Sequence, residues 1–240
     1  MRAVILAGGR GKRLMPYTTV LPKPLIPVGE MPILEILIRQ LKSFGLERIT
    51  LSVGYLGPLI VAYFGDGASY GVSIEYSQER DPLGTAGPLS LVSGLDETFV
   101  VMNGDLLTDV DFGQLIECHR QSGALLTVGV SARETRIDFG VLQITEDHRI
   151  HAYIEKPVQR YLVSMGLYVF EPKVLKYIPK AQRLDLPDVV NALLRDDQPV
   201  ASYLHEGYWM DIGRLEDCEA VQKSSDELLR RLLGSVAGTK

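Results

Sequence analysis

The amino-acid sequence predicts an α/β fold, a mixed and mostly parallel β-sheet with helices on both faces. Two observations support this prediction. Along the first half of the chain, short apolar segments that suit buried strands alternate with segments of helical hydrophobic spacing. Glycine-rich or polar residues follow where several of these strands end, which is where open α/β sheets bind their ligands. The second half has shorter elements and predicts a small, partly antiparallel region.

The first half predicts a regular alternation of strands and helices. Apolar runs bounded by turn residues predict strands at 3–6, 48–53, 72–76 and 99–102. Helices are expected at 32–44, 58–64 and 87–92. For the first of these, apolar residues recur at helical spacing at Ile33, Leu34, Leu37, Ile38 and Leu41. Pro32 suits its first turn and Gly45 its end.

The second half predicts a helix at 112–121 and a strand at 125–130, followed by a change of pattern. Strands at 139–142, 150–155 and 163–170 are expected to form a twisted, partly antiparallel lid. A helix at 187–194, a strand at 200–204 and an amphipathic helix at 215–233 complete the chain, and the last residues are expected to fray. No repeat, low-complexity tract or linker divides the sequence, so residues 1–240 are expected to form a single domain.

Composition excludes several classes of protein. The 240 residues are 46% hydrophobic and carry a net charge of −5, from 25 basic and 30 acidic residues, which disfavours nonspecific nucleic-acid binding. The start of the chain lacks a secretory pattern and no apolar stretch suits a membrane span, so we expect a cytoplasmic protein. Cys118 and Cys218 lack metal-ligand spacing and are each expected to be a small apolar residue on a helix.

A glycine-rich, basic loop follows the first strand. Gly8, Gly9 and Gly11 let the backbone approach a ligand and expose its N–H groups, and Arg10, Lys12 and Arg13 add positive charge. This pattern suits phosphate groups, with an ordinary tight turn as the alternative. It is not a P-loop, because Leu6 stands where that motif needs glycine and Arg13 where it needs serine or threonine. It is not a dinucleotide fingerprint either, because Leu14 replaces a required glycine.

Lys23 lies between Pro22 and Pro24 on a stiff, non-helical segment. A lysine with so little backbone freedom suits a residue that must point at one target. An exposed lysine on a proline-rich turn is the alternative interpretation.

Asp105 and Asp211 are carboxylates flanked closely by apolar residues and glycine. Asp105 follows the strand at 99–102 after Asn103 and Gly104. Mg²⁺ usually takes one or two protein carboxylates and completes its coordination with phosphate oxygens and water. Each aspartate alone could be an ordinary turn residue, but a phosphate loop in the same chain favours a metal site.

Glu155 and Lys156 end a predicted strand just before Pro157. A carboxylate can accept hydrogen bonds from hydroxyl groups, and a neighbouring ammonium can neutralise a phosphate. The alternative is a solvated ion pair at the surface. No nucleophile motif surrounds any serine or cysteine, and no histidine has a partner at metal or triad spacing.

Together, six segments resemble the sugar-1-phosphate nucleotidyltransferases, also called nucleotide-sugar pyrophosphorylases. They occur in the family's order over about residues 1–220, at 6–14, 22–24, 82–87, 103–105, 155–157 and 209–213. The first loop with Pro-Lys-Pro is the most specific part. The resemblance implies a Rossmann-like catalytic fold that joins a nucleoside triphosphate to a sugar 1-phosphate and releases pyrophosphate. Nucleotide binding would fall at about 1–135, sugar-phosphate binding at about 136–215, and a C-terminal helix and tail at 215–240.

The resemblance also implies a role for each matching residue. The backbone of 6–11 would cradle base and phosphates, using Leu6, Ala7, Gly8, Gly9 and Gly11. Arg13 would hold the triphosphate and the departing pyrophosphate, and Lys23 would neutralise charge at the α-phosphate. Gln78 and Gly84 would contact the base, while Asp105 and Asp211 would hold Mg²⁺, for which Mn²⁺ can substitute. Sugar hydroxyls would bind Gly140 and Glu155, and the sugar phosphate would bind Lys156.

The resemblance leaves the base and the sugar open. An amide both donates and accepts hydrogen bonds, so Gln78 could pair with guanine, uracil or thymine. Two segments, the short motif Asn-Gly-Asp at 103–105 and Ser-Met-Gly at 164–166, are most similar to those of guanylyltransferases acting on mannose 1-phosphate or a related heptose phosphate. The alternatives are a thymidylyl-, uridylyl- or cytidylyltransferase, and a non-catalytic regulatory subunit that binds nucleotide-sugars. A homo-oligomer is compatible with this family.

Overall fold

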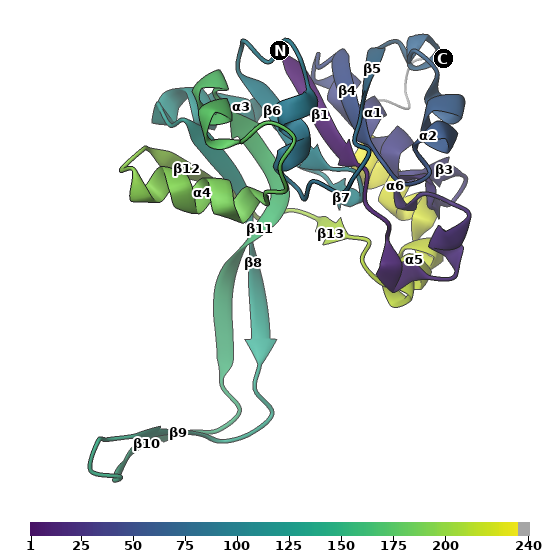
Figure 1. Cartoon of the computed structure of the whole chain (residues 1–240). Coiled ribbons are helices and arrows are strands. Elements are labelled where there is room, and N and C mark those ends of the chain that lie inside the picture. The colour runs from purple at the N-terminus through teal and green to yellow at the C-terminus, as the bar shows by residue number, and fades with distance from the viewer. Residues whose placement is uncertain (235–240) are drawn as a thin grey trace.

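The computed structural model describes residues 1–234, and the tail expected to fray beyond Gly234 lies outside the described residues. A seven-stranded sheet forms its centre (Figure 1). In spatial order the strands are β12 (Val200–His205), β8 (Leu126–Arg136), β11 (Val158–Phe170), β6 (Phe99–Asn103), β1 (Arg2–Ala7), β4 (Arg48–Val53) and β5 (Ser73–Gln78). All neighbouring pairs are parallel except those of β11, which runs antiparallel to β6 and β8. The predicted mixed, mostly parallel sheet is confirmed.

Helices cover both faces of this sheet, because side chains alternate along each strand. In β1, Ile5 belongs to one buried apolar cluster and Val4 to the other. The Ile5 face packs against α1 (Ile33–Ser43), α2 (Gly57–Phe64), α3 (Phe112–Ser122), α5 (Leu215–Lys223) and α6 (Ser225–Leu233). The Val4 face packs against α4 (Leu186–Arg195) and two 3₁₀ helices at Gly87–Leu91 and Pro172–Tyr177. Both faces are therefore covered, as predicted.

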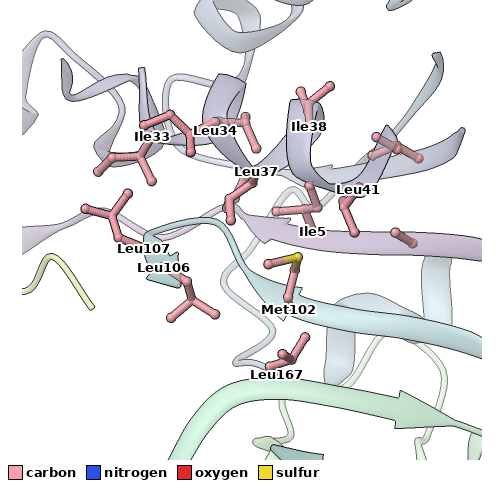
Figure 2. Packing of buried hydrophobic residues seen from close by; sticks show 14 of the residues in the cluster. Ile5, Ile33, Leu34, Leu37, Ile38, Leu41, Met102, Leu106, Leu107 and Leu167 are labelled. Atoms are coloured by element: carbon pink, nitrogen blue, oxygen red, sulfur yellow. The ribbon is translucent and has the colours of Figure 1, made fainter. Parts of the chain in front are cut away.

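Helix α1 shows how the local sequence pattern produces the core. Its apolar side chains at helical spacing point towards β1 and β6, whose Ile5 and Met102 belong to the same buried cluster (Figure 2). All five of the predicted apolar positions are 0% exposed. Gly45, at φ +76°, ends the helix in the left-handed conformation that glycine adopts easily. The predicted boundaries agree with the structure to within about one residue at each end.

Two predicted helices differ from the structure. The segment expected as a helix at 87–92 is a short 3₁₀ helix, because the Leu184 carbonyl accepts the Ala86 and Gly87 N–H groups at 2.9 and 3.1 Å. The single helix expected at 215–233 is divided at Ser224, which has non-helical φ and ψ angles of −126° and 23°. This break lets α6 turn its buried residues Leu228 and Leu232 onto the core.

The region expected as a lid is an antiparallel hairpin that projects from the body (Figure 1). We call residues 131–163 the arm. Its shaft consists of the outer halves of β8 and β11, and its tip consists of β9 (Val141–Ile144) and β10 (Ile150–Ile154). The antiparallel pairing was predicted, but the strand expected at 163–170 begins earlier, at Val158. The pairing extends because Val158 to Ser164 pairs continuously with Arg136 to Val130.

Two small two-stranded sheets complete the fold. One pairs β2 (Pro27–Val28) with β3 (Met31–Pro32), and the other pairs β7 (Leu106–Thr108) with β13 (Trp209–Asp211). The two cysteines lie on α3 and α5, as expected. No helix within residues 1–234 has the length and apolar character needed to cross a membrane.

Candidate active site

A pocket of about 320 Å³ opens where β1, β4, β5 and β6 end. Seven of the predicted site residues line it: Leu6, Ala7, Gly8, Gly9, Lys23, Gly84 and Asp105. Arg10, Ser52, Glu79, Thr85 and Asn103 also contribute to its wall. The carboxyl ends of parallel strands meet at one edge of the sheet, and the pocket lies at the edge that the sequence predicted.

The glycine loop packs tightly against the end of β5. A Cβ atom at Gly8 would lie 1.8 Å from Glu79 Oε1, so any larger residue there would displace that carboxylate. Gly11 has φ +58°, and the Thr18 hydroxyl donates to its carbonyl at 2.9 Å. The loop then enters a 3₁₀ turn at Lys12–Leu14, whose buried Leu14 leaves Arg13 exposed on the opposite side.

Lys23 and Asp105 form an ion pair at the pocket wall. Lys23 lies on the 3₁₀ turn Lys23–Leu25, and its ammonium donates to Asp105 Oδ2. Their side chains are only 13% and 22% exposed. The other carboxylate oxygen, Asp105 Oδ1, is buried and accepts no hydrogen bond. Such an oxygen is costly to bury alone, so it favours a further cationic or donor group at this position.

The pairing of β7 with β13 brings Asp211 beside Asp105, although the two lie far apart in the chain. Asp211 pairs with Leu106, and the Ile212 N–H donates to the Asp105 carbonyl at 3.1 Å. Arg13 reaches the same place, because Arg13 Nη1 and Asp211 Oδ2 each lie 3.6 Å from where a Cβ atom of Gly213 would be. The structure therefore gathers Arg13 and both aspartates at one side of the pocket, although Arg13 and Asp211 are not part of its wall.

The two aspartates fit a hard divalent cation. Asp105 offers a buried oxygen without a partner, and Asp211 lies on the adjacent strand. Within residues 1–234 there is no group of three or more His, Cys, Asp or Glu side chains suited to a metal. A cation here would complete its coordination with water and substrate phosphates, which is the mode that Mg²⁺ prefers.

Glu79 is a site residue that the sequence interpretation missed. It lines the pocket one position after Gln78, and its Oε2 accepts the Leu83 N–H at 3.0 Å. Burial raises the pKa of Glu79 above its usual value. Gln78 instead lines a neighbouring hollow of about 350 Å³ beside Tyr55. The sequence signal was partial: Glu79 directly follows the strand end, but alternation along a strand does not say which of two neighbouring residues faces a pocket.

The predicted base-contacting glycine lies on a loop that the rest of the fold anchors. Gly84 has φ +79°, and a Cβ atom there would lie 2.5 Å from the Leu184 carbonyl oxygen. Thr85 donates its N–H to Asp185 Oδ1 at 2.9 Å, at the start of α4. The loop is thereby fixed at the pocket mouth.

The predicted sugar-phosphate residues lie on the arm. Gly140 is partly buried beneath Tyr153, while Glu155 and Lys156 are exposed. The Tyr153 hydroxyl donates to Glu155 Oε2 at 3.1 Å, and Lys156 has φ +45°. None of the three lines the pocket of the same chain. Their role in binding sugar phosphate stays a prediction.

Comparisons with known proteins agree with this geometry. The family described as "Nucleotidyl transferase" matches residues 2–227. A UTP–glucose-1-phosphate uridylyltransferase of Synechocystis is 35% identical over 237 residues, which are 90% of this chain and 61% of the relative. A mannose-1-phosphate guanylyltransferase of Mycobacterium tuberculosis is 35% identical over 243 residues, which are 98% of this chain and 66% of the relative. The chain thus spans somewhat less than two thirds of the length of these curated relatives.

Solved structures share the fold. A structure from Bacillus anthracis assigned as a glucose-1-phosphate thymidylyltransferase superposes with a TM-score of 0.75 at 27% identity, covering 94% of this chain and 95% of that one. HddC from Yersinia pseudotuberculosis superposes with a TM-score of 0.70 at 24% identity, covering 93% and 98%.

Proposed function

The chain belongs to the nucleotidyl transferase family, and from this premise we propose that it joins a nucleoside triphosphate to a sugar 1-phosphate. A phosphate oxygen of the sugar 1-phosphate attacks the α-phosphorus of the triphosphate. The bond between the α-phosphorus and the bridging oxygen to the β-phosphate breaks, and pyrophosphate leaves. The observation that carries this proposal is the convergence of Lys23, Asp105, Asp211 and Arg13 beside the glycine-lined pocket.

Both reactants are anions, so the site must offset their repulsion. The glycine loop offers N–H groups close to the pocket, and Arg10 and Lys23 line it with positive charge. In this proposal Lys23 neutralises the α-phosphate, and Arg13 holds the leaving pyrophosphate. No covalent nucleophile is needed, because alignment and charge stabilisation drive this reaction.

Asp105 and Asp211 are the residues that would hold Mg²⁺ or Mn²⁺. When bound, the cation supplies positive charge at the phosphates of the reacting triphosphate. The buried, unpartnered Asp105 Oδ1 supports this assignment. Lys23 contacts the other oxygen of the same carboxylate, so it also orients Asp105.

We propose guanine as the base, on the strength of Glu79. Glu79 presents a carboxylate at the pocket wall, against Gly8. A carboxylate only accepts hydrogen bonds, and guanine is the common base whose pairing edge carries two adjacent donors, N1–H and the 2-amino group. Uracil and thymine carry one N–H between two carbonyl oxygens, which a carboxylate would repel. Several relatives, at 33–36% identity, are named as mannose-1-phosphate guanylyltransferases, which supports GTP and mannose 1-phosphate.

A second candidate is UTP with glucose 1-phosphate, because the Synechocystis relative carries that name at 35% identity. Gln78 is compatible with this alternative, since an amide can pair with uracil as well as with guanine. A non-catalytic subunit is a weaker candidate, because Arg13, Lys23 and both aspartates are all present.

The decisive measurement is pyrophosphate release over a grid of GTP, UTP, dTTP, CTP and ATP against several sugar 1-phosphates, with Mg²⁺ present. We expect the highest kcat/KM for GTP with mannose 1-phosphate or a related heptose phosphate. The highest kcat/KM for UTP or dTTP would refute the base assignment. No release with any pair would refute the catalytic proposal.

A further inference from the structure

We propose that Asp109 is a positioning residue of the active site, because it fixes the register of β13 on β7 and so holds Asp211 beside Asp105. Asp109 does not line the pocket, so it acts through Asp211. Its partners lie 96 to 122 positions away in the chain, on elements that meet only in the folded protein. This inference deepens the proposed function, on which its catalytic consequence rests.

The strand that carries Asp211 is too short to hold its own register. β13 lies between the base of the arm and α5 (Figure 1), and it pairs with β7 over three residue pairs. No other strand joins this small sheet in the described residues, and an isolated pair of strands is marginally stable in water. Because side chains alternate along a strand, a slip by one residue would turn Asp211 to the opposite face, away from Asp105. The position of Asp211 therefore depends on contacts beyond the ladder.

Asp109 makes such a contact directly where the ladder ends. Its backbone N–H donates to the Tyr208 carbonyl at 3.2 Å, and its Oδ1 accepts the Tyr208 N–H at 2.7 Å. Asp109 thus holds both backbone groups of the residue opposite it. This contact continues the pairing of Thr108 with Trp209 by one position and ties the first end of β13 to β7.

The neighbours of Tyr208 fit the carboxylate in this register. A Cβ atom at Gly207 would lie 2.3 Å from Asp109 Oδ1, so glycine makes room for the carboxylate. His205 Nε2 lies 3.0 Å from Asp109 Oδ1 and 3.2 Å from the Tyr208 carbonyl oxygen. Both partners are acceptors, so this nitrogen carries the ring proton and donates to them. A shift of one residue along β13 would place Gly207 or Trp209 opposite Asp109 and break this arrangement.

Arg231 ties the same carboxylate to the C-terminal helix α6. Its Nε donates to Asp109 Oδ2 at 2.6 Å, and its guanidinium lies 5.5 Å from the centre of the Tyr208 ring. Both oxygens of Asp109 therefore have partners, and its side chain is only 21% exposed. Hydrogen bonds between charged groups are stronger than neutral ones. Polar contacts that are shielded from water in this way can select one register among several.

The partner strand β7 is itself held by α1 and α6. Gln40 on α1 is only 4% exposed. Its Nε2 donates to the Thr108 carbonyl at 2.7 Å and to the Leu232 carbonyl at 2.8 Å. Leu232 directly follows Arg231, so the last turn of α6 contacts both braces. β7 therefore has a fixed position, and Asp109 aligns β13 to it.

The consequence for the reaction is a cation site that depends on Asp109. Asp211 stands three positions after Tyr208 on the same short strand. A loosened β13 lets Asp211 leave Asp105, and the two carboxylates no longer offer a joint site for Mg²⁺. Lys23 lies on another element and keeps its place. The affinity for the cation should therefore fall while the other binding contacts persist.

The first test measures the pairing of β13 by hydrogen exchange and mass spectrometry of a peptide that covers residues 208–212. Asp109→Asn keeps the size of the side chain and removes its charge, and it should raise exchange there about tenfold or more. Arg231→Ala should act in the same direction. Asp111→Asn is the matched control, because Asp111 accepts the Gln114 N–H at 2.9 Å as a helix cap, which asparagine replaces well. Unchanged exchange in folded Asp109→Asn would overturn the proposal.

The second test separates positioning from general stability. Asp109→Asn should raise the Mg²⁺ concentration needed for the half-maximal rate of pyrophosphate release about tenfold, with kcat recovered at saturating Mg²⁺. KM for the sugar 1-phosphate should change little. A merely structural role would reduce the amount of folded enzyme and leave the Mg²⁺ requirement unchanged, which would contradict the proposal. If the wild type releases no pyrophosphate, the proposed function fails, while hydrogen exchange still decides whether Asp109 fixes β13.

Discussion

Replacing Glu79 by glutamine should change the base preference of the enzyme. The substitution keeps the size of the side chain and its position at the pocket wall. It replaces one of the two acceptor oxygens by an N–H₂ donor. Guanine then loses a charge-assisted acceptor and meets a donor facing one of its own donors. Uracil and thymine gain a group that both donates and accepts.

The expected magnitude follows from the hydrogen bond that guanine no longer makes with a carboxylate. A hydrogen bond to a charged group contributes roughly 1.5–3 kcal/mol, so kcat/KM for GTP should fall about tenfold to a hundredfold. The values for UTP and dTTP should hold or rise, because the repulsion between the carboxylate and their carbonyl oxygens disappears. The ratio of kcat/KM for GTP to kcat/KM for UTP should therefore change by a larger factor than kcat/KM for GTP alone.

The pH dependence gives an independent check. Burial raises the pKa of Glu79, so its proton is lost only at a higher pH than for an ordinary glutamate. The proposed recognition of guanine uses the carboxylate form of Glu79, so kcat/KM for GTP should fall as the pH drops through this raised pKa. The amide of Glu79→Gln does not titrate, so kcat/KM for GTP of this variant should lack this decrease at low pH. Guanine binding favours the charged form, so kcat should fall only at a lower pH than kcat/KM does.

The assay is steady-state pyrophosphate release with GTP and UTP at saturating sugar 1-phosphate. Glu75→Gln is the matched control, since it makes the same chemical change on the strand that Glu79 directly follows, with a side chain 62% exposed and paired with Arg2 at 3.3 Å. It should leave the GTP-to-UTP ratio unchanged. An unaltered ratio in folded Glu79→Gln would refute the role of Glu79 in base selection.

Four other outcomes are expected. Lys23→Ala should lower kcat at least about a hundredfold with an unchanged circular dichroism spectrum, because it removes a preorganised charge at the reacting phosphate; near-normal turnover would contradict this. Asp105→Asn and Asp211→Asn should each raise the Mg²⁺ concentration needed for the half-maximal rate about tenfold or more, which corresponds to a loss of ~1.4 kcal/mol in binding free energy. Full activity in excess chelator would show that the reaction needs no metal. Lys156→Ala should raise KM for the sugar 1-phosphate about tenfold to a hundredfold while KM for the triphosphate changes little, with partial rescue by Lys156→Arg; equal rises in both constants would show that the site is elsewhere. Leu37→Ala, at a 0% exposed position, should lower the free energy of unfolding by about 2–5 kcal/mol in urea titrations, and a decrease well below 1 kcal/mol would contradict the tight packing of α1.

Local patterns predicted most of the secondary structure because local physics decides it. The spacing of Leu37, Ile38 and Leu41 makes α1 amphipathic whatever surrounds it, and the apolar run at 99–102 forms β6 as expected. The errors occur where distant groups intervene. The Leu184 carbonyl captures the N–H groups of Ala86 and Gly87, and the core draws Leu228 and Leu232 inward after a break at Ser224.

Part of the site was predictable for the same reason. Gly8 and Asp105 follow the ends of β1 and β6, and parallel strands bring those ends to one edge. Glu79 was missed because Gln78 and Glu79 both lie at the strand end, and alternation alone does not say which of two neighbours faces a pocket. Only the packing of Glu79 against Gly8 decides between them.

The sequence by itself determined the α/β alternation, the phosphate-type glycine loop and the identities of the charged groups. These depend on residue types and short spacings, which local sterics and hydrophobic burial translate directly into structure. Tertiary structure alone decided that β13 pairs with β7 and so brings Asp211 beside Asp105, that Lys23 contacts that carboxylate, and that the arm carries Glu155 and Lys156 away from their own pocket. Such contacts join residues up to about a hundred positions apart, and no local rule fixes them, because many pairings satisfy the same local preferences until the whole core is packed.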